Sequence, residues 1–110
     1  MNKEFLNDLE ELILTMVAGN NDQAYGAAIT YELEQSLHRK VTLSVVHVIL
    51  YRLEDKGYVK SKVGGATRER GGRSKRIYSI TNSGIAVLKM MKQTRLDLWK
   101  LVPQLKPSTL

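Results

Sequence analysis

The segment Val63–Tyr78, VGGATRERGGRSKRIY, gathers the groups of this chain that are best suited to bind an anion. Its sixteen residues include four glycines and five basic side chains, with Glu69 as the single acid. Glycine lets a backbone approach a phosphate closely, arginine offers forked hydrogen bonds, and lysine supplies a point charge. These residue types suit three kinds of structure: a nucleotide-binding loop, a disordered basic linker, and a charged hairpin that contacts an anionic surface.

The spacing within this segment excludes the nucleotide-binding loop. Such a loop needs Gly-x-x-x-x-Gly-Lys-Ser/Thr between a strand and a helix. The glycines between Gly65 and Gly72 do not have that spacing, Ser74 precedes Lys75, and a strand-like segment follows. Glycine and charge favour a mobile loop, and this interpretation is compatible with a hairpin that becomes ordered on DNA.

The net charge of +6 has its origin in the same part of the chain. Residues 58–80 carry seven bases and one acid, whereas residues 1–37 carry seven acids and one base. The chain outside residues 58–80 holds ten charges of each sign. Charge concentrated in this way indicates an anionic partner, of which nucleic acid is the commonest, and a merely solvated basic loop is the alternative.

Other chemistry finds little support in the residue types. The chain has no cysteine and two histidines, His38 and His47, which stand nine residues apart. There is no His-Glu-x-x-His, no nucleophile elbow and no pair of metal ligands. The acidic pairs Glu10–Glu11 and Glu54–Asp55 are expected on solvated helix faces. We therefore expect neither an enzyme nor a cofactor.

Hydrophobic runs limit where the protein can reside. No apolar run approaches the roughly 18 to 20 residues that a membrane span needs, and the acidic N-terminal stretch lacks the apolar core of a signal peptide. The absence of cysteine is compatible with a reducing compartment. We expect a single soluble, cytoplasmic domain with no membrane partner.

Hydrophobic periodicity predicts the elements that position the basic segment. Apolar spacings of three and four indicate helices, and alternating or β-branched residues indicate strands. The predicted helices cover about residues 4–18, Gln23–His38, Leu43–Lys56 and Asn82–Val102, and the predicted strands cover Tyr58–Val63 and Arg76–Ile80. Asp22, Thr42 and Thr81 are placed to cap the later helices, and Gly57 to end the third.

This order of elements is that of a winged helix-turn-helix with a long C-terminal dimerisation helix. The fold class is mainly α with a small β-hairpin (α+β). We expect one DNA-binding domain over residues 1–103, with dimerisation helices at about 4–18 and 82–102 and a flexible tail at 104–110. In this architecture the third helix enters the major groove and the basic hairpin loop, the wing, contacts the backbone or the minor groove.

The third helix is expected to turn Val46, Ile49 or Leu50, and Leu53 inward. Ser44 and His47 would then be free to hydrogen-bond to base edges, and Val45 to contact a thymine methyl group. His47 is equally well interpreted as an ordinary surface histidine. The wing residues predicted to bind phosphate are Arg68, Arg70, Arg73 and Lys75.

The last helix has apolar residues on more than one face. Such a surplus indicates a partner chain, and a symmetric dimer that pairs the first and last helices would bury it. The predicted interface residues are Leu9, Ile13, Leu88, Met91, Leu98, Trp99 and Val102. Trp99 is interpreted either as plain interface packing or as a flat platform for a small effector.

The same residues resemble the PadR family of transcriptional regulators from about Ala24 to Leu88. YGAAITYELEQSLHRKVTLSVVHVILYRLEDKGYVKSKV is similar to the family's helix-turn-helix, and ERGGRSKRIYSITNSGIAVL to the wing GGRxKRxYxLTxxGxxAL of one subgroup. The resemblance implies DNA contacts near Tyr25, from Thr42 to His47, and in the wing. His47 and Ser44 depart from it, because the family usually has tyrosine and glycine there.

The resemblance also implies a homodimer held by the last and first helices. Short members of the family usually repress genes, and some sense small aromatic or cationic compounds near the interface, where Trp99 stands. We therefore expect a sequence-specific regulator of transcription that binds double-stranded DNA as a dimeric repressor. The alternative is a winged-helix protein-interaction module whose basic hairpin binds an acidic protein.

Overall fold

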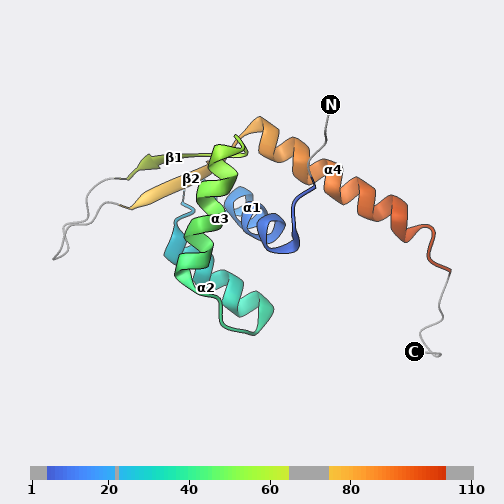
Figure 1. Cartoon of the computed structure of the whole chain (residues 1–110), viewed down its shortest axis with the longest axis horizontal. Coiled ribbons are helices and arrows are strands. Elements are labelled where there is room, and N and C mark those ends of the chain that lie inside the picture. Colours follow the sequence, from blue (N-terminus) through green and yellow to red (C-terminus); the bar gives the residue numbers. More distant parts are fainter. Residues whose placement is uncertain (1–4, 22, 65–74, 104–110) are drawn as a thin grey trace.

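The computed structural model describes residues 5–21, 23–64 and 75–103. Within these ranges the chain forms a mainly helical α+β fold with an antiparallel hairpin (Figure 1), as the periodicity predicts. The elements are α1 (Asp8–Gly19), α2 (Gly26–Leu37), α3 (Leu43–Asp55), β1 (Val59–Val63), β2 (Arg76–Ile80) and α4 (Asn82–Trp99). Their order is that of a winged helix, which confirms the predicted fold class.

The core forms around α3. Its inward side chains are all buried, so that Ile49 and Leu50 both belong to the predicted stripe. They meet buried side chains from α1, α2 and the hairpin, because α3 contacts α1, α2 and β1. The fully buried members of this core include Ile13, Leu14, Val17, Ile29, Leu33, Val46, Leu50, Leu53 and Met91.

The second helix begins three residues later than predicted. Ala24 forms an isolated β-bridge with Tyr78, whose N–H donates to the Ala24 carbonyl at 2.7 Å. This pairing keeps the chain extended up to Tyr25, which occupies the N-cap position of α2 without a side-chain cap. Asp22, the predicted cap, lies outside the described residues.

The hairpin joins α3 to α4 through capping contacts. Gly57 has the left-handed φ of 81° that ends α3, as its position predicts. Thr81 caps α4 by accepting from the Gly84 N–H, and its hydroxyl donates to the Gly57 carbonyl at 2.6 Å. A Cβ at Gly84 would lie 2.3 Å from the Tyr58 carbonyl oxygen, so glycine is required for this approach of α4 to the hairpin.

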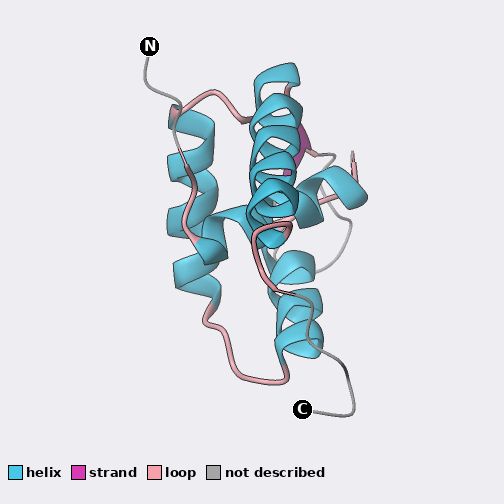
Figure 2. Cartoon of the chain, turned by 90° about the vertical axis from the view of Figure 1, so that its right-hand side faces the viewer, coloured by secondary structure: helices cyan, strands magenta, loops and turns pink. Residues whose placement is uncertain are grey.

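The last helix projects from the body of the molecule. Figure 1 shows α4 and the hairpin extending from opposite sides of the other three helices. In the view turned by 90° (Figure 2), α4 points toward the viewer and the strands lie behind it. The far end of α4 therefore has no cover from the described part of the chain, and Trp99 is 71% exposed.

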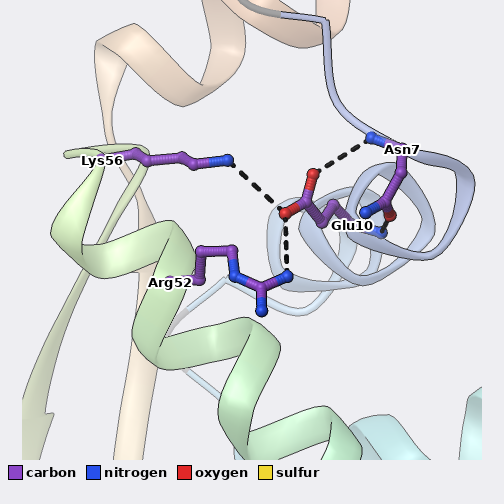
Figure 3. A network of polar contacts seen from close by, with 4 residues as sticks. All are labelled: Asn7, Glu10, Arg52 and Lys56. Carbon is purple, nitrogen blue, oxygen red and sulfur yellow. Dashed lines mark hydrogen bonds and ion pairs between the residues drawn. The ribbon is translucent and has the colours of Figure 1, made fainter.

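The orientation of α3 relative to α1 is fixed by a buried carboxylate. Glu10 is 4% exposed, which is contrary to the expected solvated face. Its Oε2 lies 3.4 Å from Nη1 of Arg52 and 3.5 Å from Nζ of Lys56, both of which come from the end of α3 (Figure 3). Its Oε1 accepts the Asn7 N–H at 3.0 Å, and Asn7 in turn caps α1 in a capping box.

Replacing Glu10 with glutamine is expected to destabilise the fold. Glutamine retains an acceptor for the Asn7 N–H but removes the negative charge that Arg52 and Lys56 share. We expect the free energy of unfolding to fall by about 1–2 kcal/mol, because the exposed sides of the two cations let water compensate in part. Urea denaturation followed by circular dichroism measures this change.

Glu32→Gln is the matched control, because Glu32 is exposed on α2 and its hydrogen bond from Asn20 can be accepted by an amide oxygen. We expect this variant to change the free energy of unfolding by less than about 0.5 kcal/mol. Equal effects of the two substitutions would show that the buried network contributes nothing of its own.

Candidate nucleic-acid interface

The outer side of α3 is open along its first half. Thr42 caps the helix as predicted, because its Oγ1 accepts the Val45 N–H at 3.4 Å. Ser44, Val45, Val48 and Tyr51 are exposed, and His47 is half-buried. Ser44 and Val45, which are predicted to contact bases, therefore share one accessible surface at the start of the helix.

His47 is held in place by the start of α2. A Cβ added to Gly26 would meet the imidazole of His47, so the ring packs closely against Gly26 and would have to move if another residue stood there. On the other side its ring centroid is 6.2 Å from that of Tyr51, with the planes tilted by 51°. His47 thus has a structural contact within the fold in addition to its accessible edge.

Tyr25 and Lys75, two predicted DNA contacts that are fifty residues apart in sequence, meet at the base of the hairpin. Nζ of Lys75 lies 4.3 Å from the centroid of the Tyr25 ring, which is a cation–π contact. The bridge between Ala24 and Tyr78 brings the two segments together. Through Gly26 this contact adjoins His47, so the start of α2, α3 and the hairpin form one continuous surface.

The hairpin strands carry exposed positive charge. Lys60, Lys62, Lys75 and Arg76 are all exposed. Arg76 also donates from Nη1 to Ser61 Oγ at 2.9 Å, and Ser61 donates to Oε2 of Glu54 at 2.7 Å, which links the hairpin to α3. The predicted wing contacts Arg68, Arg70 and Arg73 lie outside the described residues.

The tyrosine of β2, Tyr78, joins the hairpin to the hydrophobic core. Tyr78 is 3% exposed. Its burial, together with the nearby Tyr51 and Glu54, raises the pKa of its hydroxyl to about 12, and Arg76 acts in the opposite direction. The hydroxyl is therefore neutral at physiological pH, and the charge of the surface comes from its lysines and arginines.

Val48 and Tyr51 of α3 are exposed and were not among the predicted contacts. Val48 and Tyr51 are 52% and 53% exposed, and they follow Ser44 by four and seven residues, which is the spacing of one helix face. That spacing could have identified them. Arg39 and Lys40, exposed immediately before α3, add two further cations.

A second candidate site is an open groove of about 630 Å³ between α1 and α4. Trp99, Leu88 and Leu96 supply apolar walls, and Glu11 forms an ion pair with Arg95 beside them. The ion pair joins α1 to α4 at the edge of the groove. Trp99 is therefore an exposed aromatic side chain in the wall of this groove, as a platform for an effector would have to be.

The predicted dimer residues divide into three groups. Ile13 and Met91 are fully buried in the chain's own core, so they are corrected from interface to core residues. Leu9 and Leu88 are partly buried against that core. Leu98, Trp99 and Val102 are exposed at the far end of α4, and no contact within the described ranges covers them. Only the last group offers a surface that is wholly free for a second chain.

Two further features are absent from the described residues. Those residues include no cluster of three or more histidines or acids that could hold a metal ion. Among the described helices, none is long and apolar enough to cross a membrane.

The chain matches a known family along most of its length. The model of the transcriptional regulator PadR-like family matches residues 13–90, which include α2, α3, both strands, most of α1 and the first half of α4. Curated protein sequences contain no significant match to the chain.

Solved structures include several with the same fold. RosR from H. salinarum is 28% identical with a TM-score of 0.64, and the alignment covers 94% of this chain and 84% of that chain. A PadR-like transcription factor from Bacteroides fragilis is 18% identical with a TM-score of 0.70, covering 84% of each chain. A PadR-like transcriptional regulator from Bacillus cereus is 19% identical with a TM-score of 0.65, covering 88% of this chain and 93% of that chain.

Proposed function

The chain belongs to the PadR-like family of transcriptional regulators, and we propose that it is a homodimeric repressor that binds a specific sequence in double-stranded DNA. Membership of this family makes the chain a regulator of transcription and not an enzyme. The observation that carries the proposal is the continuous surface formed by the open side of α3 and the basic hairpin, joined where Lys75 lies over Tyr25. The repressor role rests on the family resemblance of short chains with one C-terminal helix.

The shape of this surface suits a DNA duplex. The first half of α3 is free to enter the major groove, with Ser44 and the accessible edge of His47 near the bases. Lys60, Lys62 and Lys75 are then placed to bind phosphates on one side of the groove. Arg68, Arg70 and Arg73 extend the same basic segment in the sequence, and we propose phosphate contacts for them as well.

A protein-interaction module is the second candidate. The exposed apolar side chains of α3, Leu43, Val45 and Val48, favour it, because apolar surface is common in protein interfaces. Against it stand the cations on both sides of α3, from Arg39 and Lys40 before the helix to Lys60 and Lys62 in β1. Such flanking charge fits a polyanion such as DNA better than an ordinary protein surface.

Dimerisation is proposed to occur through the exposed end of α4. Leu96, Leu98, Trp99 and Val102 form an apolar surface on a helix that projects away from the body. Phe5, which precedes α1, and Leu12 of α1 are exposed as well, and we propose that they extend the contact because α1 packs beside α4. Two copies related by a two-fold axis would cover these residues and place two α3 helices for successive half-sites of an inverted repeat.

The groove between α1 and α4 is proposed to bind a small aromatic or cationic effector. Trp99 offers a ring face for stacking, and Glu11 offers a carboxylate whose present partner is Arg95. A cation could compete with Arg95 for that carboxylate. Because the groove adjoins the proposed dimer surface, a bound effector would touch both subunits.

We expect the purified protein to shift a selected operator in the presence of an excess of random competitor DNA. Lys62→Ala and Lys75→Ala should weaken binding to all sequences alike, and each should reduce the slope of log affinity against log salt by about one phosphate contact. Lys100→Ala is the control, because Lys100 is exposed at the far end of α4 and should leave the slope unchanged. If the protein bound the operator no better than the competitor DNA, the protein-interaction module would be the remaining candidate function.

Leu98→Asp is expected to convert the dimer into a monomer, because a charge would be buried at the centre of the proposed apolar contact. Sedimentation equilibrium at micromolar concentration measures the mass directly. Tyr31→Asp is the matched control, because Tyr31 is 64% exposed on α2 and lies outside the proposed contact. A wild-type protein that sediments as a monomer would contradict this mode of assembly.

Planar aromatic cations are expected to quench the fluorescence of Trp99, which is the single tryptophan of the chain. The quenching should saturate with concentration, and Glu11→Gln should weaken it because the groove then lacks its carboxylate. Neutral aromatics of equal size serve as controls for stacking alone. Linear, non-saturating quenching by every compound would count against an effector site.

A further inference from the structure

The open side of α3 carries no formal charge over its first nine residues. From Leu43 to Tyr51 the sequence LSVVHVILY contains neither acid nor base apart from His47. Its accessible side chains are dominated by Val45 and Val48, which are 42% and 52% exposed. The solvent-facing side of a helix in a monomer usually carries polar groups. This apolar surface therefore indicates a specific partner.

Hydrogen-bonded base recognition requires side chains that this surface lacks. The bidentate contacts that distinguish base pairs in the major groove come from arginine or lysine for guanine and from asparagine or glutamine for adenine. The first half of α3 contains none of these. Arg52 lies farther along the helix, and its guanidinium is directed toward Glu10 at 3.4 Å. The remaining donors near the bases are Ser44 and His47.

Apolar side chains distinguish bases in a different way. The only methyl group that an unmodified base pair displays in the major groove is that at C5 of thymine, which 5-methylcytosine also carries. Val45 and Val48 line a shallow hollow on the outer side of α3, together with Ser44, Ile49 and Arg52. Two valines three residues apart on a helix are neighbours, so they form one apolar contact surface.

We propose that α3 selects its DNA site chiefly through the 5-methyl groups of pyrimidines, which Val45 and Val48 contact in the major groove. This inference rests on the proposed function, in which α3 enters that groove. It adds which feature of the DNA site is recognised: pyrimidines that carry a 5-methyl group, at one or two positions of each half-site. In unmodified DNA these pyrimidines are thymines. Ser44 and His47 then supply secondary hydrogen bonds, and the basic residues of the hairpin supply affinity that is independent of sequence.

The charge distribution supports DNA over an apolar protein surface as the occupant. In the sequence, the valines lie between exposed cations that precede α3, Arg39 and Lys40, and exposed cations of the hairpin that follows it, Lys60 and Lys62. An apolar strip with basic flanks matches a major groove, whose floor displays methyl groups and whose edges are phosphates.

The test begins with an operator selected from a random duplex pool by the wild-type protein. Each thymine of a half-site is then replaced in turn by deoxyuridine, which removes the methyl group and leaves every hydrogen-bonding atom unchanged. We expect at least one replacement in each half-site to lower the affinity about fourfold, which is the effect of leaving one methyl group unburied. Other thymines should tolerate the change within about twofold.

Two further duplexes separate the methyl group from the rest of the base edge. At the sensitive position, the thymine is replaced by cytosine or by 5-methylcytosine, each paired with guanine. The 5-methylcytosine duplex should bind about fourfold more tightly than the cytosine duplex, because the two differ in the methyl group alone. Equal affinity of these duplexes would overturn the proposal even if deoxyuridine had an effect.

Substitutions in α3 assign the contact to named side chains. In Val48→Ala or Val45→Ala, the ratio of affinities for the thymine and deoxyuridine duplexes should fall toward one at the position that the valine contacts. Both sites are exposed and alanine favours helix, so these variants should remain folded. Val63→Ala is the matched control, because Val63 is 59% exposed at the end of β1 and should leave the ratio at about four.

The outcomes distinguish this inference from the proposed function. If the selection yields no preferred sequence, specific DNA binding itself fails, and the inference fails with it. If an operator is bound specifically but every deoxyuridine is tolerated within about twofold, the protein is a specific regulator that does not read methyl groups. Sensitivity to deoxyuridine that persists in Val45→Ala and Val48→Ala would also overturn the role given to the two valines.

Discussion

The inward side of α3 packs Val46, Leu50 and Leu53 against α1, α2 and β1, and the other elements are arranged around this contact. Burial of these side chains fixes the rotation of α3 about its own axis. The same rotation leaves Ser44 and Val48 on the outside, because residues on opposite sides of a helix cannot both face the core. The accessible surface of α3 is thus a direct consequence of how its core side is packed.

Contacts distant in sequence complete the surface around α3. The bridge between Ala24 and Tyr78 draws the start of α2 against the hairpin, and Gly26 leaves room for the His47 ring. Glu10 holds the other end of α3 through Arg52 and Lys56. Each of these contacts joins segments that the chain separates by twenty residues or more, so together they determine how the helix and the hairpin lie relative to one another.

Local patterns in the sequence predict most of this architecture. Helical spacing, the threonine caps at Thr42 and Thr81, and Gly57 suffice for the element order, because they depend on neighbours within one turn. The start of α2 is wrong by three residues because the pairing of Ala24 with Tyr78 overrides the local cap. Long-range pairing of that kind leaves no signal in the neighbouring residues.

The candidate sites are less accessible to sequence reasoning. An acidic pair such as Glu10–Glu11 suggests a solvated face, and only the packing of α1 shows that the first acid is buried. Ile13 and Met91 were expected at the dimer surface because α1 and α4 each have apolar residues over a broad arc. The angle between the helices decides which part of that arc is buried in the chain's own core. Residue spacing carries no information on that angle.

Glu10 and Glu11 are consecutive residues, and consecutive side chains on a helix point about 100° apart. One forms its ion pairs with α3 and the other with α4. A rigid rotation or sliding of α1 therefore displaces both ion pairs together. The helix with the most acidic first turn in this basic chain thus holds, through adjacent side chains, both the helix that carries Trp99 and the helix whose outer side is exposed.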